Sequence, residues 1–231
     1  MQKLQVVMIM TDQVKSKQRV ADYGEVFTAE REVKAMCDLV KDETERIDSR
    51  FLEPACGEGA FLTEILRRKL AVVRKKYSRS VTDYEKNSLL AVSSLYGVDI
   101  LADNAKTCRE RLFEIWDSEY MAVCGKACSD DVRNSVQFIL SLNIICGNGI
   151  SMRRVDDNGN DTEIPIVFSE WAFISDMNIQ RSDYTFDELL NGDRPENDDM
   201  PDWFGCFETD EGTFLKKYVC DYRKLGVTDN G

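Results

Sequence analysis

The sequence contains no histidine, and this absence removes several kinds of catalytic site at once. A Ser-His-Asp or Cys-His arrangement needs an imidazole as its general base, so neither can be assembled within this chain. Proline is also scarce, with four in 231 residues, and no two of them are adjacent. No apolar run approaches the roughly 20 residues that span a bilayer, so we expect no membrane segment.

Positive charge is in short supply as well. Lysine and arginine number 30 against 42 aspartates and glutamates, which gives a formal net charge of -12. This charge repels nucleic acid, so contact with DNA would need a local basic patch or a partner chain. The basic residues that could form such a patch are Arg67, Arg68, Lys69, Arg74, Lys75, Lys76 and Arg79. A solvated face of a long helix explains this basic cluster more simply.

The eight cysteines are scattered singly. The apolar start Leu4–Met10 is short and predicts a strand or packing arm, not a signal peptide. We therefore expect reduced thiols in a cytoplasmic protein. A zinc site would have to combine Cys124 and Cys128 with a distant residue such as Cys108 or Cys146, and we expect no metal.

The stretch Glu53–Ala60 reads Glu-Pro-Ala-Cys-Gly-Glu-Gly-Ala and is the most informative part of the chain. An apolar pair precedes it and a helical pattern follows, so the predicted order is strand, glycine turn, helix. Gly57 and Gly59 would let backbone and a helix N-terminus approach a ligand. Glu53 adds a hydrogen-bond acceptor, which suits hydroxyls or an amine and points to a nucleoside-type cofactor.

The apolar spacing predicts alternating helices and strands. We expect helices near 28–41, 61–77, 82–95, 103–116 and 130–140, and strands at 50–54, 96–100, 143–147 and 164–168. This order predicts an α/β fold with a mainly parallel sheet flanked by helices. Glu53, Asp99 and Asn148 close three of the strands, and ligands of such sheets bind at the carboxyl ends of strands. Thr28 and Asp103 are candidate helix caps.

Three regions follow from this pattern. We expect an N-terminal arm over 1–24, a cofactor-binding domain over 25–171, and a small, irregular, acidic C-terminal extension over 172–231.

The segment from Glu53 to Leu62 resembles the S-adenosylmethionine motif of adenine-specific DNA N6-methyltransferases, the modification subunits of restriction-modification systems. Gly24–Ala29 is similar to the N-terminal motif of that family, Tyr96–Ile100 to its ribose-binding strand, and Asn143–Ile150 to the strand that contacts the cofactor adenine. The resemblance covers about residues 18–150. It implies a Rossmann-like methyltransferase fold and S-adenosyl-L-methionine as the cofactor.

Carried onto this chain, the resemblance implies ten cofactor-binding residues: Phe27, Thr28, Glu53, Ala55, Gly57, Gly59, Phe61, Asp99, Ile100 and Asn148. Asp99 would accept the ribose hydroxyls, whereas Phe61 would either line the pocket or belong to the core. Asn148 stands where the family has aspartate, and a charged acceptor is worth about 1–2 kcal/mol more than a neutral one. Ala29 stands where the family has proline.

The family's catalytic Asn/Asp-Pro-Pro-Tyr/Phe motif is missing, because the chain has no Pro-Pro pair. Ser169-Glu170-Trp171 occupies the equivalent place. Glu170 could accept hydrogen bonds from a target amino group and Trp171 could stack on a flipped base. The alternative is a strand end with a packing tryptophan.

The resemblance implies a DNA adenine N6-methyltransferase acting as the modification subunit of a restriction-modification system. Because the extension over 172–231 is acidic and carries no evident target-recognition domain, we expect a partner polypeptide to supply recognition or catalysis. Two alternatives stay open: a non-catalytic cofactor-binding subunit, and a methyltransferase for a small molecule or a protein.

Overall fold

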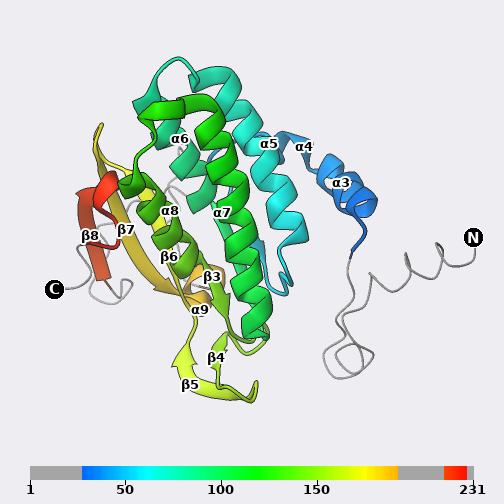
Figure 1. Cartoon of the computed structure of the whole chain (residues 1–231). Coiled ribbons are helices and arrows are strands. Elements are labelled where there is room, and N and C mark those ends of the chain that lie inside the picture. Colours follow the sequence, from blue (N-terminus) through cyan, green and yellow to red (C-terminus); the bar gives the residue numbers. More distant parts are fainter. Residues whose placement is uncertain (1–27, 192–215, 228–231) are drawn as a thin grey trace, which may run out of the picture.

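The computed structural model describes residues 28–191 and 216–227 (Figure 1). Its first half contains α3 (Glu30–Leu39), α4 (Lys41–Thr44), β1 (Phe51–Glu53), α5 (Ala60–Tyr77), α6 (Val81–Ser93), β2 (Leu95–Asp99), α7 (Ala102–Cys124), the 3-10 helix η1 (Gly125–Ala127), α8 (Asp130–Asn143) and β3 (Ile144–Cys146). The remaining elements are β4 (Arg153–Val155), β5 (Asp161–Pro165), β6 (Val167–Phe173), β7 (Asn178–Thr185), α9 (Phe186–Asn191), β8 (Lys216–Asp221) and the 3-10 helix η2 (Tyr222–Lys224). The described chain is thus a mixed α/β structure, and the predicted arm over 1–24 lies outside it.

A three-stranded parallel sheet in the order β1-β2-β3 forms the centre. Phe51 pairs with Leu95, and Gly97 pairs with Ile144. Two helices connect each strand to the next, α5 and α6 in the first connection and α7 and α8 in the second. The carboxyl ends of the three strands therefore lie at one edge, as the alternating pattern predicts.

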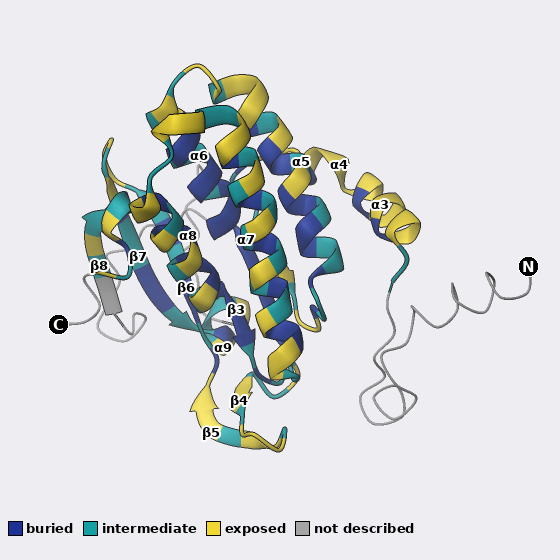
Figure 2. Ribbon diagram, in the orientation of Figure 1, coloured by how far each residue is buried: buried dark blue, intermediate teal, exposed yellow. Residues whose placement is uncertain are grey.

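The sheet has an apolar cluster on each face. The helices supply most of the first, including the fully buried Leu66 and Trp116. On the other face, Tyr96 and Val98 of β2 pack with residues of β6 and α9, among them Phe168 and Phe186. Figure 2 shows the buried sides of α5 to α8 turned toward the interior.

The prediction of a mainly parallel sheet is wrong after β3. The segment 164–168, predicted as one strand, is divided between β5 and β6 at the buried Ile166. β4 and β5 form an antiparallel hairpin, and β6-β7-β8 form a second antiparallel sheet. The Asp156 carboxylate accepts the N–H groups of Asn158 and Asn160, each at 2.9 Å, and closes the turn that sends β5 back along β4.

The described parts of the C-terminal extension, 172–191 and 216–227, are more regular than predicted. β6 runs across the predicted boundary at residue 171, and β7 pairs with it from Val167↔Thr185 to Phe173↔Ile179. α9 and β8 follow. Polar side chains satisfy each other inside this sheet, since Asp183 of β7 accepts hydrogen bonds from Ser169 and Arg181. The segment therefore lacks the apolar alternation by which a strand is predicted from sequence.

Two predicted helix caps are also wrong. The N-cap of α3 is Ala29, without a side-chain hydrogen bond, so Thr28 precedes the cap. The N-cap of α7 is Leu101, and Asp103 lies in the first turn, where its charge favours the helix dipole. The predicted end of α5 at Tyr77 is confirmed.

Candidate functional site at the strand ends

Asp99 organises the carboxyl edge of the parallel sheet. Its Oδ2 accepts the Gly57 N–H at 2.8 Å, and its Oδ1 accepts the Leu101 N–H at 2.9 Å and the Asn104 side-chain amide at 3.3 Å. The side chain is nearly buried between these donors. Asp99 therefore ties the glycine turn after β1 to the start of α7, and its contact with ribose hydroxyls stays a prediction.

The glycine turn needs both of its glycines, for different reasons. Gly57 has φ 52° and Gly59 has φ 77°, so both occupy the left-handed region that disfavours side chains. A Cβ on Gly59 would lie 2.4 Å from Cys108 Sγ, whereas a Cβ on Gly57 would meet nothing within 4 Å. Gly59 is thus required by packing, while the position of a side chain on Gly57 is open space.

Glu53, the last residue of β1, carries the unsatisfied group of the site. Its Oε2 is enclosed and has no hydrogen-bond partner in the described part of the chain. Burial, together with the nearby charge of Asp99, raises the pKa of Glu53 to about 8. An enclosed carboxyl oxygen without a donor is costly, and a ligand hydroxyl or amine would satisfy it. Glu53 is therefore the best-placed ligand acceptor of this edge.

Asn148 shapes the loop after β3. Its Oδ1 accepts the N–H groups of Ile150 at 2.9 Å and Ser151 at 3.3 Å, and its Nδ2 donates to Asp161 Oδ1 at 3.0 Å. Both ends of the amide are therefore engaged within the protein. The contact of Asn148 with a cofactor adenine stays a prediction.

Close approach of two loops explains the glycine that follows Asn148. A Cβ on Gly149 would lie 2.4 Å from the carbonyl oxygen of Pro54. The loops after β1 and β3 therefore touch each other at this edge.

The other predicted cofactor residues occupy varied positions. Ala55 is exposed on the turn, and Ile100 is half-buried directly after β2. Phe61 packs against the core from the first turn of α5, which favours its core interpretation. Thr28 begins the described chain, and Phe27 lies outside it.

The two predicted catalytic residues lie away from this edge. Glu170 is ion-paired with Arg50, directly before β1. Trp171 is buried and donates from Nε1 to Asn143 Oδ1 at 3.4 Å, directly before β3. Both contacts are at the amino ends of the strands, about 10 Å along a three-residue strand from the carboxyl edge. The structure does not bring Glu170 and Trp171 together with Glu53, and Trp171 belongs to the core.

Sequence reasoning missed two residues that support the site. Asn104 is buried and donates to Asp99, and Cys108 lies under Gly59. Both lie in the first two turns of α7, four residues apart and therefore on one face of the helix. Their position directly after β2 is the sequence signal that could have identified them.

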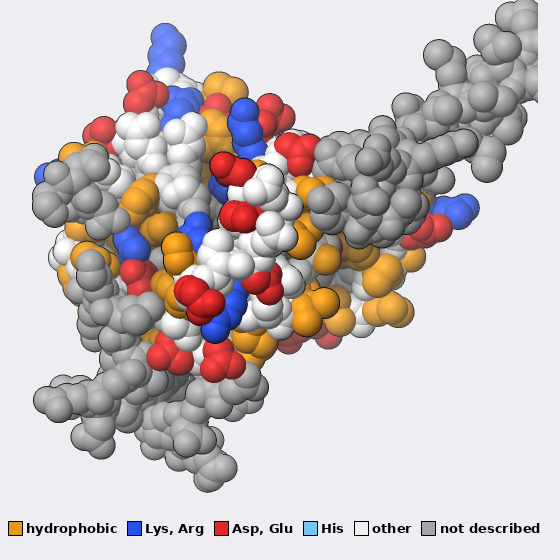
Figure 3. Space-filling view, turned by 90° about the horizontal axis from the view of Figure 1, so that it is seen from below, with side chains coloured by type: hydrophobic (Ala, Val, Ile, Leu, Met, Phe, Trp, Pro, Cys, Tyr) orange, Lys and Arg blue, Asp and Glu red, His pale blue; other side chains and the backbone are white. Residues whose placement is uncertain are grey.

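Acidic side chains lie across this end of the molecule, with a few basic ones among them (Figure 3). Figure 3, seen from below, shows Asp and Glu side chains gathered across the middle of the face. Next to the turn, Arg111 donates to the Glu58 carbonyl oxygen at 2.9 Å, so its charge is partly committed. A surface with this balance disfavours phosphate-bearing ligands and favours hydroxyls or a cationic amine.

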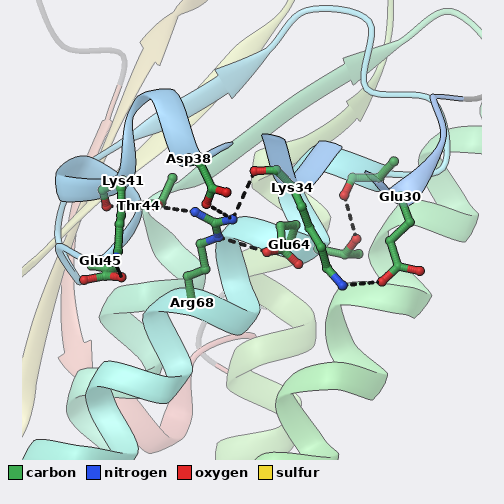
Figure 4. A network of polar contacts seen from close by, with 10 residues as sticks. Glu30, Lys34, Asp38, Lys41, Thr44, Glu45, Glu64 and Arg68 are labelled. Carbon is green, nitrogen blue, oxygen red and sulfur yellow. Dashed lines mark hydrogen bonds and ion pairs between the residues drawn. The ribbon is translucent and has the colours of Figure 1, made fainter. Parts of the chain in front are cut away.

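The basic cluster of α5 does not form one free patch. Arg68 donates to Glu64 at 2.9 Å and to the Lys34 carbonyl oxygen at 3.2 Å, and it pairs with Asp38 at 2.8 Å, as Figure 4 shows. Lys69 is fully buried, and burial lowers its pKa to about 7. These two residues hold the protein together and are not available to DNA.

No helix in the described ranges is both long and apolar enough to cross a membrane. Among the same residues, no three Cys, Asp or Glu side chains gather in a way that would hold a metal ion. No family model, curated protein or solved structure matches the chain.

Proposed function

We propose that the carboxyl edge of the β1-β2-β3 sheet binds S-adenosyl-L-methionine. The observation that carries this proposal is the enclosed Oε2 of Glu53, which has no hydrogen-bond partner among the described residues and lies at the end of the strand that leads into the glycine turn. The cofactor offers an amine and two ribose hydroxyls as donors and carries no phosphate, which suits the acidic face. The motif resemblance of Glu53–Leu62 points to the same ligand.

Only some of the predicted binding side chains are left to contact the cofactor. Asp99 and Asn148 use their side chains on protein N–H groups, and the Gly57 N–H is donated to Asp99, so Glu53 is the principal group left for the ligand. The resemblance implies that the bound cofactor supplies a methyl group. The residues of this chain would hold and orient the cofactor at the strand ends.

We further propose a role in adenine N6 methylation of DNA as a modification subunit that acts with a partner chain. The partner is required because Glu170 and Trp171 lie at the opposite ends of the strands. The net charge of -12 also favours a partner that makes the DNA contacts. The same placement of Glu170 and Trp171 favours a second candidate, a cofactor-binding subunit that has no catalytic role.

Calorimetry with S-adenosyl-L-methionine tests the first proposal. We expect saturable binding to the full chain. Above pH 8, where Glu53 is ionised, Glu53→Gln removes a charge-assisted hydrogen bond and should lower the affinity at least about tenfold. Glu45→Gln, a solvated control, should change the affinity little. ATP, which shares the adenosine but adds phosphates, should bind more weakly. Equal binding of ATP, or no binding of either ligand, would show that this edge is not a site for this cofactor.

Methyl transfer separates the two roles. Labelled cofactor, DNA and the chain would be combined with and without the products of neighbouring genes. Transfer to adenine that needs both this chain and a partner supports the modification subunit. If the cofactor binds but the partner transfers methyl groups equally well without this chain, the non-catalytic role is favoured.

A further inference from the structure

The turn that follows β3, residues 148–152, is closed tightly on itself. Met152 donates its N–H to the Asn148 carbonyl oxygen at 2.9 Å. The Asn148 side chain accepts the N–H groups of Ile150 at 2.9 Å and Ser151 at 3.3 Å from within the same turn. This turn, called the β3 turn below, leads into the β4–β5 hairpin (Figure 1) and has a fixed shape.

The backbone of the β3 turn is strained. Met152 has φ 58°, and it is the one non-glycine residue with a positive φ among the residues that the structure describes. Side chains rarely adopt this conformation, because Cβ crowds the following carbonyl oxygen. Met152 is held there from both sides, since its N–H donates to Asn148 and its carbonyl oxygen accepts the Ile166 N–H at 2.9 Å. Strain of this kind clusters at functional sites, which singles out the β3 turn as a candidate ligand contact.

Ser151 carries an unsatisfied hydroxyl in this strained turn. Its Oγ is enclosed and has no hydrogen-bond partner in the described part of the chain. Of the buried side-chain atoms in this condition within residues 28–191 and 216–227, only Glu53 Oε2 and Ser151 Oγ lie outside the helices. An enclosed polar atom without a partner is costly, and an atom of a ligand would satisfy it.

A contact between two loops brings Glu53 and Ser151 to the same part of the sheet edge. A Cβ on Gly149 would lie 2.4 Å from the carbonyl oxygen of Pro54. Pro54 directly follows Glu53, and Ser151 is two residues from Gly149, so each unsatisfied residue starts within about 8 Å of this contact along the backbone. One extended ligand that lies across the contact can therefore reach both side chains.

The two groups offer complementary chemistry. An ionised carboxylate only accepts hydrogen bonds, whereas a hydroxyl can also donate one. The N–H groups of Ile150, Ser151 and Met152 are donated inside the β3 turn, so the Ser151 hydroxyl is a donor that remains for a ligand. Asp161 accepts from the Asn148 amide at 3.0 Å, and its charge disfavours an anionic acceptor beside this turn. A neutral acceptor, such as a ring nitrogen or an ether oxygen of a nucleoside, fits the hydroxyl best.

We propose that the Ser151 hydroxyl donates a hydrogen bond to a neutral acceptor atom on the nucleoside part of the ligand that Glu53 holds. This contact rests on the proposed cofactor site and adds to it a residue that determines specificity. A ligand without such an acceptor would leave the hydroxyl unsatisfied and would bind more weakly.

Calorimetry with Ser151→Ala tests the contact. We expect the affinity for S-adenosyl-L-methionine to fall about three- to tenfold, as for the loss of one hydrogen bond. Adenosine, measured by competition with labelled cofactor, should lose affinity by the same factor, because it keeps the nucleoside acceptors. Ser118→Ala removes an exposed hydroxyl from α7 and is the matched control, which should change neither affinity. Ser151→Cys donates only weakly and should also lose affinity, so it decides the question if Ser151→Ala does not fold.

A stability measurement separates this contact from a structural role. Without ligand, Ser151→Ala should resist urea at least as well as wild type, because no hydrogen bond of the described chain is lost. Reduced stability would show that the hydroxyl is satisfied inside the protein and would overturn the proposal.

The binding results distinguish failure of this contact from failure of the cofactor site. Unchanged cofactor affinity in folded Ser151→Ala would overturn the contact and leave the cofactor site in place. So would a loss confined to the cofactor, with adenosine unaffected, because the hydroxyl would then not bind the nucleoside. A wild-type protein that binds no cofactor would contradict the proposed function itself, and the Ser151 contact with it.

Discussion

The carboxylate of Asp99, at the end of β2, accepts the backbone N–H of Gly57 at 2.8 Å, in the turn after β1. Replacing Asp99 with alanine leaves this N–H and that of Leu101 without their acceptor. We expect Asp99→Ala to lower the free energy of unfolding by about 1–3 kcal/mol, and to weaken cofactor binding because the turn loses its support. Urea denaturation and calorimetry measure the two effects. Asp103→Ala, in the same loop region, is the control and should change both much less.

The two glycines of the turn should respond differently to alanine. Gly57→Ala places a side chain in the left-handed region but in open space, which costs about 1–2 kcal/mol. Gly59→Ala adds a clash with Cys108 Sγ at 2.4 Å, so we expect a further loss of about 1–3 kcal/mol. Chemical denaturation of both variants provides the comparison.

A double-mutant cycle tests the cause of that difference. If contact with Cys108 is responsible, Cys108→Ala should recover part of the stability lost in Gly59→Ala, and none of that lost in Gly57→Ala. Equal effects of Cys108→Ala in both backgrounds would mean that backbone strain alone accounts for the loss.

Glu53 should make stability depend on pH. Its pKa is raised from 4.5 to about 8 by burial and by Asp99, so the folded protein holds a proton that the unfolded chain releases. Stability contributed by this group is therefore full below pH 4.5 and is lost as pH rises to about 8. Relative to wild type, Glu53→Gln should gain stability across this window, and denaturation at pH 5, 6.5 and 8 measures the gain. A constant difference between the two proteins would contradict the raised pKa.

The clamp around Glu85 should anchor the C-terminal segment. The Glu85 carboxylate is buried and accepts the hydroxyls of Tyr120 at 2.6 Å and Tyr222 at 2.7 Å, and Arg223 at 2.6 Å. We expect Tyr222→Phe to cost about 1–3 kcal/mol, since a buried carboxylate oxygen loses a donor. Tyr218→Phe, which keeps the ring that stacks on Arg181, is the control. Unfolding monitored by circular dichroism should show the loss only in Tyr222→Phe.

Local signals predicted the elements well where the pattern was complete within one stretch of chain. The strand–glycine turn–helix unit at β1 and α5 is confirmed, because glycine spacing and helical periodicity are properties of adjacent residues. The parallel order of β1 to β3 follows from the helical connections between them. Glu53 was placed at a strand end for the same reason.

Long-range pairing was the part that could not be predicted. The apolar run 164–168 is compatible with a parallel or an antiparallel strand, and only the hairpin turn at Asp156 decides between them. Glu170 and Trp171 lie next to each other in sequence after a strand, but Arg50 and Asn143 determine which end of the sheet they meet. These contacts join residues 120 and 28 positions apart.

The sequence by itself determined that a glycine turn follows a strand ending in an acid, and that two further strands end in polar residues. Those features depend on spacing along the chain. Only the tertiary structure decided what each polar residue does, because hydrogen bonding depends on which donors surround it. Asp99 and Asn148 are satisfied by protein N–H groups, whereas the enclosed Glu53 Oε2 has no donor within residues 28–191 and 216–227.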